Sequence, residues 1–255
     1  TDNQQRFIDS LKEFVYDNSF EGLFTAIFYA YTEKDSIITK NKDYLPSLLN
    51  EVLEVKTEID KFERVYNSIL TKLDNSVLIK IYHLYLSDIK ETDTLVLNYL
   101  KLCYSYGASI NLAKNNDIII LVDKYSRRVT YEAHRFTGFV RFKEITPLNF
   151  YASIEPDHNI LPLLINHFTK RFSDQNFIIH DLKRNTAIIY NKKNVTITEF
   201  NKEDANIFLN SNSDGYFENL WKTFYSSVNI KERENPKLRR QYMPKRYWNH
   251  LTELK

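Results

Sequence analysis

The hydrophobic pattern of the chain changes its period once, just after Gly138, and this change limits the folds that the chain can adopt. Before Gly138 the apolar residues recur every three or four positions, as Ile59, Phe62, Val65 and Ile69 do, which is the spacing of an amphipathic helix. After Gly138 they alternate with polar residues, which is typical of half-buried strands. A run of helices followed by a run of strands predicts an α+β fold.

The first half is predicted to be helix-rich, with one short strand over residues 12–16. Ser19 is placed to cap a helix over 20–31, because its hydroxyl can accept a hydrogen bond from a backbone N–H of the first turn. The helical spacing continues over residues 57–73, 76–89 and 93–103, and Asp117 is predicted to cap a long helix that ends near Phe136.

The second half is predicted to form a mostly antiparallel sheet with flanking helices. The expected strands are 139–142, 150–154, 177–181, 186–190 and 195–200, and the expected helices are 160–172 and 216–230. A basic C-terminal arm follows. We therefore expect a helix-rich N-terminal part (1–136), a sheet part (137–230) and an arm (231–255), or all three packed as one compact domain.

Composition excludes several classes of protein. Cys103 is the one cysteine of the chain, so an internal disulfide, a four-thiolate zinc site and a cysteine-ligated iron–sulfur cluster are ruled out. The apolar run 118–122 is far shorter than the roughly 20 residues that span a bilayer. The N-terminal residues do not resemble a secretory signal. We expect a cytoplasmic protein without a membrane partner.

The net charge of +2 hides an asymmetry between the two halves of the chain. Residues 1–123 carry 13 Lys+Arg and 19 Asp+Glu, whereas residues 124–255 carry 22 and 14. A basic half favours binding to a polyanion.

The long helix has one apolar and one basic face. Val122, Val129, Ala133 and Phe136 fall on one arc at 100° per residue, and the opposite arc is basic with a tyrosine among the cations. Guanidinium groups bind phosphate oxygens and an aromatic ring can stack on an exposed base. The alternative is an ordinary solvated helix face.

The arm carries a second basic cluster, with seven basic and two acidic residues over 231–246. Its aromatic residues could anchor it to the sheet part while its arginines stay exposed. The predicted nucleic-acid-binding residues of helix, sheet and arm together are Lys124, Arg127, Arg128, Tyr131, His134, Arg135, Arg141, Arg171, His180, Lys183, Arg184, Arg233, Arg239, Arg240, Lys245, Arg246, Tyr247 and Trp248.

Motifs for catalysis are sparse. The chain has no Walker loop, GxGxxG, HExxH or GxSxG sequence, its histidines fit no standard zinc spacing, and we expect neither a metal nor a cofactor. One pattern carries an alternative: Asp157 after one strand, with Asp181 and Lys183 after another, resembles a restriction-type nuclease core. A helix intervenes where that core has a direct hairpin.

Several segments together resemble a bacterial family described as DNA metabolism or DNA repair proteins. They are Tyr16–Leu23, Glu132–Phe142, Ile154–Leu164, His167–Phe172, Ile179–Asp181 and Arg233–Trp248. Asn18 stands where the family has Gly, and Asn also tolerates the left-handed conformation of that turn.

The resemblance implies a genomic neighbour, a radical SAM protein assigned to DNA modification, and fusion elsewhere to a uracil-DNA-glycosylase-like domain. It implies no catalytic residues, so whether the chain is an enzyme stays open. Three functions remain: a DNA-binding accessory to a radical SAM repair or modification enzyme, a metal-dependent nuclease or hydrolase that uses Asp157, Asp181 and Lys183, and a protein-interaction module with an acidic docking half.

Overall fold

The computed structural model describes residues 11–45, 50–201, 203, 222, 223, 226 and 235–254. The chain forms two compact units, 1–129 and 130–255. The boundary falls inside helix α5 (Asp117–Phe139), whose first half belongs to the first unit and whose second half belongs to the second. The fold class is α+β, as the change of period predicts.

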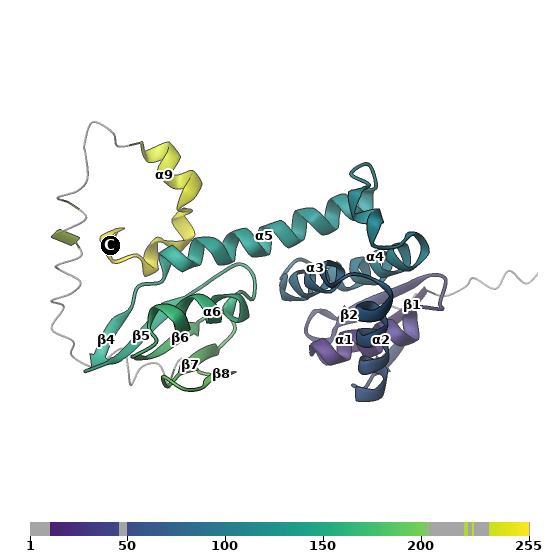
Figure 1. The fold of residues 1–255 in the computed structure, drawn as a ribbon, viewed down its shortest axis with the longest axis horizontal. Helices are drawn as coiled ribbons and strands as arrows, with labels where there is room; N and C mark the ends of the chain where they lie inside the picture. The colour runs from purple at the N-terminus through teal and green to yellow at the C-terminus, as the bar shows by residue number, and fades with distance from the viewer. Residues whose placement is uncertain are drawn as a thin grey trace, which may run out of the picture. The chain divides into compact units, whose positions relative to one another are not determined.

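The first unit contains a three-stranded parallel sheet, of which the sequence indicated only the central strand. The strands are β1 (Leu11–Tyr16), β2 (Ser36–Lys40) and β3 (Asn50–Val55), in the order β2-β1-β3 (Figure 1). Both outer strands run parallel to β1. Their carboxyl ends therefore lie at one edge of this sheet.

Helices cover this sheet and supply most of the core of the unit. They are α1 (Phe20–Ala30), α2 (Ile59–Lys72), α3 (Asn75–Leu86), α4 (Thr92–Tyr106) and the first half of α5, with short 3₁₀ turns η1 (Asn41–Asp43) and η2 (Ala108–Leu112). The helices predicted from the apolar spacing are confirmed. Ile119 and Val122 of α5 are fully buried in the same cluster as Phe14 and Leu23, so α5 is part of this core.

The turn between β1 and α1 is a compact hydrogen-bonded structure. Ser19 caps α1 as predicted, and its Oγ accepts a bond of 2.8 Å from the N–H of Gly22. Asp17 accepts bonds from the Ser19 hydroxyl and the Thr57 hydroxyl. Asn18 has a φ of 69°, the left-handed conformation in which Asn can replace Gly.

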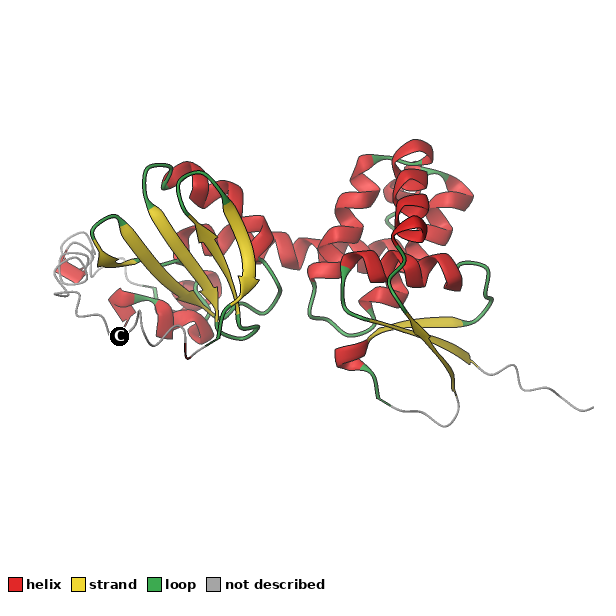
Figure 2. Ribbon diagram, turned by 90° about the horizontal axis from the view of Figure 1, so that it is seen from below, coloured by secondary structure: helices red, strands yellow, loops and turns green. Residues whose placement is uncertain are grey.

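The second unit is built on a five-stranded mixed sheet with the order β4-β5-β6-β7-β8 (labelled in Figure 1; strands yellow in Figure 2). The strands are β4 (Lys143–Thr146), β5 (Asn149–Ile154), β6 (Asn176–Asp181), β7 (Thr186–Tyr190) and β8 (Val195–Glu199). Only β5 and β6 pair in parallel, and helix α6 (Leu161–Arg171) forms their crossover. The expected mostly antiparallel sheet is confirmed.

Aromatic rings fill the space between α6 and this sheet. Phe168 of α6 is buried beside Phe142, Phe172 and Phe177, with ring centroids 5.5 to 6.4 Å apart. Pro162 lies in the first turn of α6, where its missing N–H costs no helical hydrogen bond.

The described part of the arm consists of α9 (Pro236–Tyr242) and the 3₁₀ turns η4 (Lys245–His250) and η5 (Thr252–Leu254). Pro236 begins α9, and Pro244 precedes η4. The prolines therefore interrupt the arm, as expected.

Two boundaries differ from the sequence prediction. Residues 139–142 are not a strand: Phe139 ends α5, and the N–H of Val140 still bonds to Phe136 in helical fashion. The cap of α5 is Asn116 and not Asp117, because the Asn116 Oδ1 accepts the N–H groups of Ile118 and Ile119.

The predicted helix 216–230 falls almost wholly outside the described residues. No helix in the described ranges has the length and apolarity to cross a membrane.

Candidate nucleic-acid interface

Helix α5 has the two faces that its sequence predicts. Val122, Val129, Ala133 and Phe136 are buried. The side chains on the opposite arc are exposed, apart from a half-buried Arg135; they are Lys124, Arg127 and Arg128 in the first unit, and Tyr131 and His134 in the second. The part of the predicted interface that lies in the second unit therefore begins at Tyr131.

The arm packs on the second half of α5 through Tyr247. The Tyr247 ring is 2% exposed and lies 4.9 Å from the ring of Phe136 and 6.0 Å from that of Phe139, between centroids. Arg141, just after α5, forms a two-point ion pair with Glu253 at 2.6 and 3.2 Å. These contacts fix the arm to α5 and to the residues just after it, through one residue of η4 and one of η5.

A buried carboxylate, that of Glu132, holds this junction together. Its oxygens accept bonds of 2.8 Å from the N–H groups of Asp157 and His158, in the loop after β5, and a further bond from the Tyr247 hydroxyl. Burial and the neighbouring Glu132 carboxylate raise the pKa of Tyr247 above its ordinary value. The phenol therefore stays protonated and remains a donor.

Tyr131 and Arg135 form an ordered pair on the outer face of α5. The Arg135 guanidinium carbon lies 4.3 Å from the centroid of the Tyr131 ring. One guanidinium nitrogen donates a bond of 3.0 Å to the carbonyl of Gln241 in α9. This contact joins the helix face to the arm.

The arm contributes further cations around an indole ring. Arg239 and Lys245 each lie 5.9 Å from the centroid of the Trp248 ring, and the indole N–H bonds to the carbonyl of Met243 at 2.8 Å. Arg240, Lys245 and Arg246 are exposed. Arg233 lies outside the described residues.

Four of the predicted binding residues are held inside the second unit. His180 is completely buried, with its Nδ1 3.0 Å from the Tyr151 hydroxyl. Arg141 and Arg184 are bound to carboxylates, and Tyr247 is buried against α5. Arg171 and Lys183 are exposed. The nucleic-acid role of the whole set stays a prediction.

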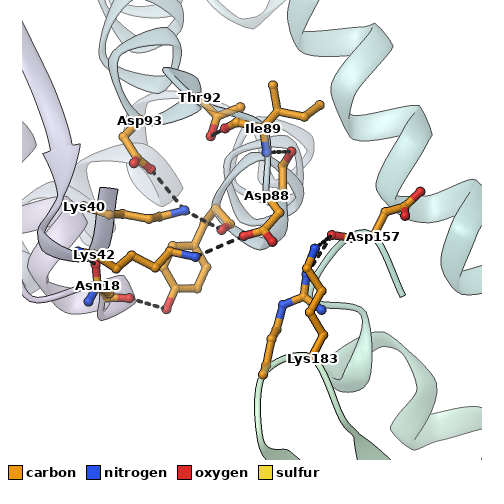
Figure 3. Close-up of polar contacts among 12 residues, drawn as sticks. Asn18, Lys40, Lys42, Asp88, Ile89, Thr92, Asp93, Asp157 and Lys183 are labelled. Carbon is orange, nitrogen blue, oxygen red and sulfur yellow. Dashed lines mark hydrogen bonds and ion pairs between the residues drawn. The ribbon is translucent and has the colours of Figure 1, made fainter. Parts of the chain in front are cut away.

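The three residues of the nuclease hypothesis lie at one end of the parallel strand pair. The Lys183 ammonium bonds at 3.0 Å to the backbone carbonyl of Asp157 (Figure 3). The Asp157 carboxylate faces Arg246 at 2.6 Å, and the fully buried Asp181 carboxylate faces Arg184 at 2.7 Å. Each carboxylate is thus neutralised by its own arginine.

Within the described ranges, no three His, Cys, Asp or Glu side chains are grouped so that they could hold a metal ion. Arg184 also donates to the carbonyls of Pro156 and Asp157, at 3.2 and 2.7 Å. The Arg184 guanidinium therefore lies between the loop after β5 and the Asp181 carboxylate at the end of β6. The nuclease hypothesis would place a metal cation in this region.

The first unit carries a polar cluster that sequence reasoning missed. Lys40, at the end of β2, is buried 3.6 Å from Asp93 and donates to the carbonyl of Tyr85, while Lys42 pairs with Asp88 at 3.0 Å (Figure 3). Burial raises the pKa of Asp93. Without a prediction of β2, nothing in the sequence placed these residues together.

Glu132, which holds the junction with the arm, and Tyr242 are absent from the predicted set of binding residues. Glu132 is the one acidic residue over positions 124–139, and this isolation was the only signal in the sequence. Tyr242, in α9, is 54% exposed beside Gln241. Glu132 contacts the arm and Tyr242 belongs to it, and the pattern of neighbouring residues did not predict where the arm packs.

Comparison with protein families matches residues 90–253 to DUF4130, a domain of unknown function. No curated protein and no solved structure matches the chain. The matched range contains α4, α5, the five-stranded sheet and the described arm. Since the match covers more than half of the 255 residues, this chain belongs to the DUF4130 family.

Proposed function

We propose that this chain is a DNA-binding accessory protein of a repair or modification system, and that it holds DNA on the second half of α5 and the arm. The observation that supports this most is the contact between Arg135 and Gln241. It joins a basic helix face to a basic segment more than one hundred positions away in sequence. The two clusters therefore act as one surface.

The chemistry of this surface suits a phosphate backbone. Arg240 and Lys245 are exposed in the arm, and His134 is exposed on α5. Guanidinium groups bind phosphate oxygens through paired N–H donors. The acidic residues near the arm are already engaged, since Glu132 is buried and Asp157 pairs with Arg246.

The partner proposal comes from the family resemblance and from charge. Residues 1–123 carry six more acidic than basic side chains, so we assign this acidic segment, which ends before the basic face of α5, to docking a radical SAM DNA-modification enzyme. Co-purification of the two proteins in the absence of DNA, weakened by salt, is the expected result. Failure to associate at low salt would reject the docking role.

The DNA proposal is tested by the salt dependence of binding. Each phosphate neutralised releases condensed counterions, so log affinity falls with log salt by about 0.9 per duplex contact or about 0.7 per single-strand contact. We expect a slope of roughly −3, measured by fluorescence anisotropy with the full chain. Absence of binding to either form at low ionic strength would reject the proposal.

A matched pair of double variants locates the contacts. Arg239→Ala with Arg240→Ala should weaken binding to all sequences alike and flatten the slope by about one to two units. Lys72→Ala with Lys90→Ala removes the same charge from exposed positions of the first unit and should leave the slope unchanged. An equal change of the salt slope in both double variants would show that binding depends on total charge and not on the proposed surface.

A further inference from the structure

We propose that this surface selects single-stranded or extrahelical nucleotides over duplex DNA, with Tyr131 as the ring on which a base stacks. This inference rests on the proposed function and specifies its substrate. The inference depends on how the aromatic rings are exposed and held in place on the surface, and not on the number of cations.

The Tyr131 ring is exposed and already oriented. It is 46% exposed on α5, and the Arg135 guanidinium lies over it at 4.3 Å. Arg135 is itself held by the Gln241 carbonyl at 3.0 Å. Because one face of the ring is backed by a fixed cation, little side-chain entropy remains to be lost when a base stacks on the ring.

The arm presents two more rings, and one of them, Trp248, lies next to cations. Tyr242 is 54% exposed and follows Gln241 directly. Trp248 has Arg239 and Lys245 near its face. Aromatic rings interleaved with cations along a basic surface are typical of single-strand binding, because every base offers a π-face and every nucleotide a phosphate.

Duplex DNA cannot use these rings in the same way. Its bases are stacked on one another, so only phosphates and groove edges remain for contact. A helix that reads the major groove must also enter it. The Arg135–Gln241 contact places α9 directly beside the exposed face of α5. The arm therefore obstructs the entry of this helix face into a major groove.

The test compares three probes with the full chain at equal salt. They are a single strand of about 12 thymidines, a duplex of the same length, and a single strand of the same length that lacks its bases. We expect the thymidine strand to bind about tenfold more tightly than either of the others, because stacking is lost in both.

Variants of Tyr131 separate stacking from charge and from folding. Tyr131→Leu should reduce the preference for the thymidine strand about tenfold, and Leu is a better helix former than Tyr, so α5 should persist. Tyr131→Phe should keep the preference. Tyr106→Leu removes an exposed tyrosine (67%) from the first unit as the matched control and should have no effect.

The outcomes distinguish this inference from the proposed function. Equal binding of thymidine strand and duplex, unchanged by Tyr131→Leu, would overturn the single-strand preference and leave DNA binding intact. Equal binding of the baseless strand and the thymidine strand would do the same. Absence of binding to every probe would overturn both.

Discussion

The hydroxyl of Tyr247 donates a hydrogen bond to the buried carboxylate of Glu132, which lies 115 positions earlier in the chain. The same carboxylate accepts the N–H groups of Asp157 and His158. One side chain thus fixes both the loop after β5 and the arm. The position of the proposed DNA surface therefore depends on a residue that is itself buried.

Glu132→Gln should destabilise the second unit by about 1–3 kcal/mol, because the amide nitrogen of Gln would face an N–H donor and leave buried groups unpaired. Tyr247→Phe keeps the ring on Phe136 and should cost about 1 kcal/mol. Urea unfolding measures both. Glu63→Gln, at an exposed position of α2, is the control, and an equally large loss there would contradict the assignment.

Two glycines should respond in opposite ways to alanine. A Cβ at Gly22 would lie closer than 3.0 Å to oxygen atoms of Asp17, Ser19 and Thr57, whereas one at Gly138 meets nothing within 4 Å. We expect Gly22→Ala to lower the melting temperature and Gly138→Ala to raise stability by about 0.5–1 kcal/mol through its better helix propensity. Similar melting temperatures for the two variants would contradict this packing.

The boundary between the units predicts which fragments fold. A fragment that ends at Asn116 lacks Ile119 and Val122, both fully buried in the core of the first unit. We expect it to lose helical circular dichroism, and a fragment that ends at Phe136 to retain a cooperative thermal transition. Partner-binding tests should use the longer fragment. A stable fragment ending at Asn116 would show that α5 is dispensable for this core.

Buried tyrosines should make the protein sensitive to alkali. Burial raises the pKa of Tyr85 and of Tyr151 to about 12, whereas an unfolded tyrosine titrates near 10. The folded state binds these protons more tightly, so stability is complete below about pH 10 and is lost as the pH rises towards 12. Urea unfolding across this range measures the loss, and Tyr151→Phe should make it smaller. A flat profile would contradict the burial.

The nuclease hypothesis predicts loss of metal-dependent cleavage in both aspartate variants, and we expect a different result. Asp157→Asn affects a half-exposed pair with Arg246, so it should change stability by less than about 1 kcal/mol and leave DNA affinity equal or slightly higher. Asp181→Asn removes the charged carboxylate partner of the largely buried Arg184 and should destabilise by about 3–5 kcal/mol. Magnesium-dependent cleavage that Asp157→Asn abolishes in a folded protein would favour the nuclease.

The sequence pattern correctly predicted the elements that depend on interactions between residues close in sequence, such as apolar spacing along a helix and helix capping. The helices around Ile69 and Leu84 have apolar residues at helical spacing, and Ser19 caps its own helix. Strands β2 and β3 were missed because they are short and pair only with β1, in parallel, across a distance in sequence. A five-residue run such as Ser36–Lys40 carries little periodicity by itself.

Residues 139–142 show how tertiary contacts overrode a local pattern. Val140 and Phe142 lie on either side of the charged Arg141, the apolar–polar alternation of a strand. In the structure Phe139 packs on Tyr247, and Arg141 binds Glu253. Both partners belong to the arm, and the sequence did not indicate where the arm would dock. The same lack of long-range information left Glu132 out of the predicted site.

The Tyr247–Glu132 bond also has a consequence for folding kinetics. It closes a loop of 115 residues, and loops of this length form only after the intervening chain has become compact. We therefore expect the contact to be absent from the folding transition state. Changes at this junction should then accelerate unfolding while leaving the refolding rate nearly constant. The arm, in these terms, sets how long the second unit stays folded and not how quickly it forms.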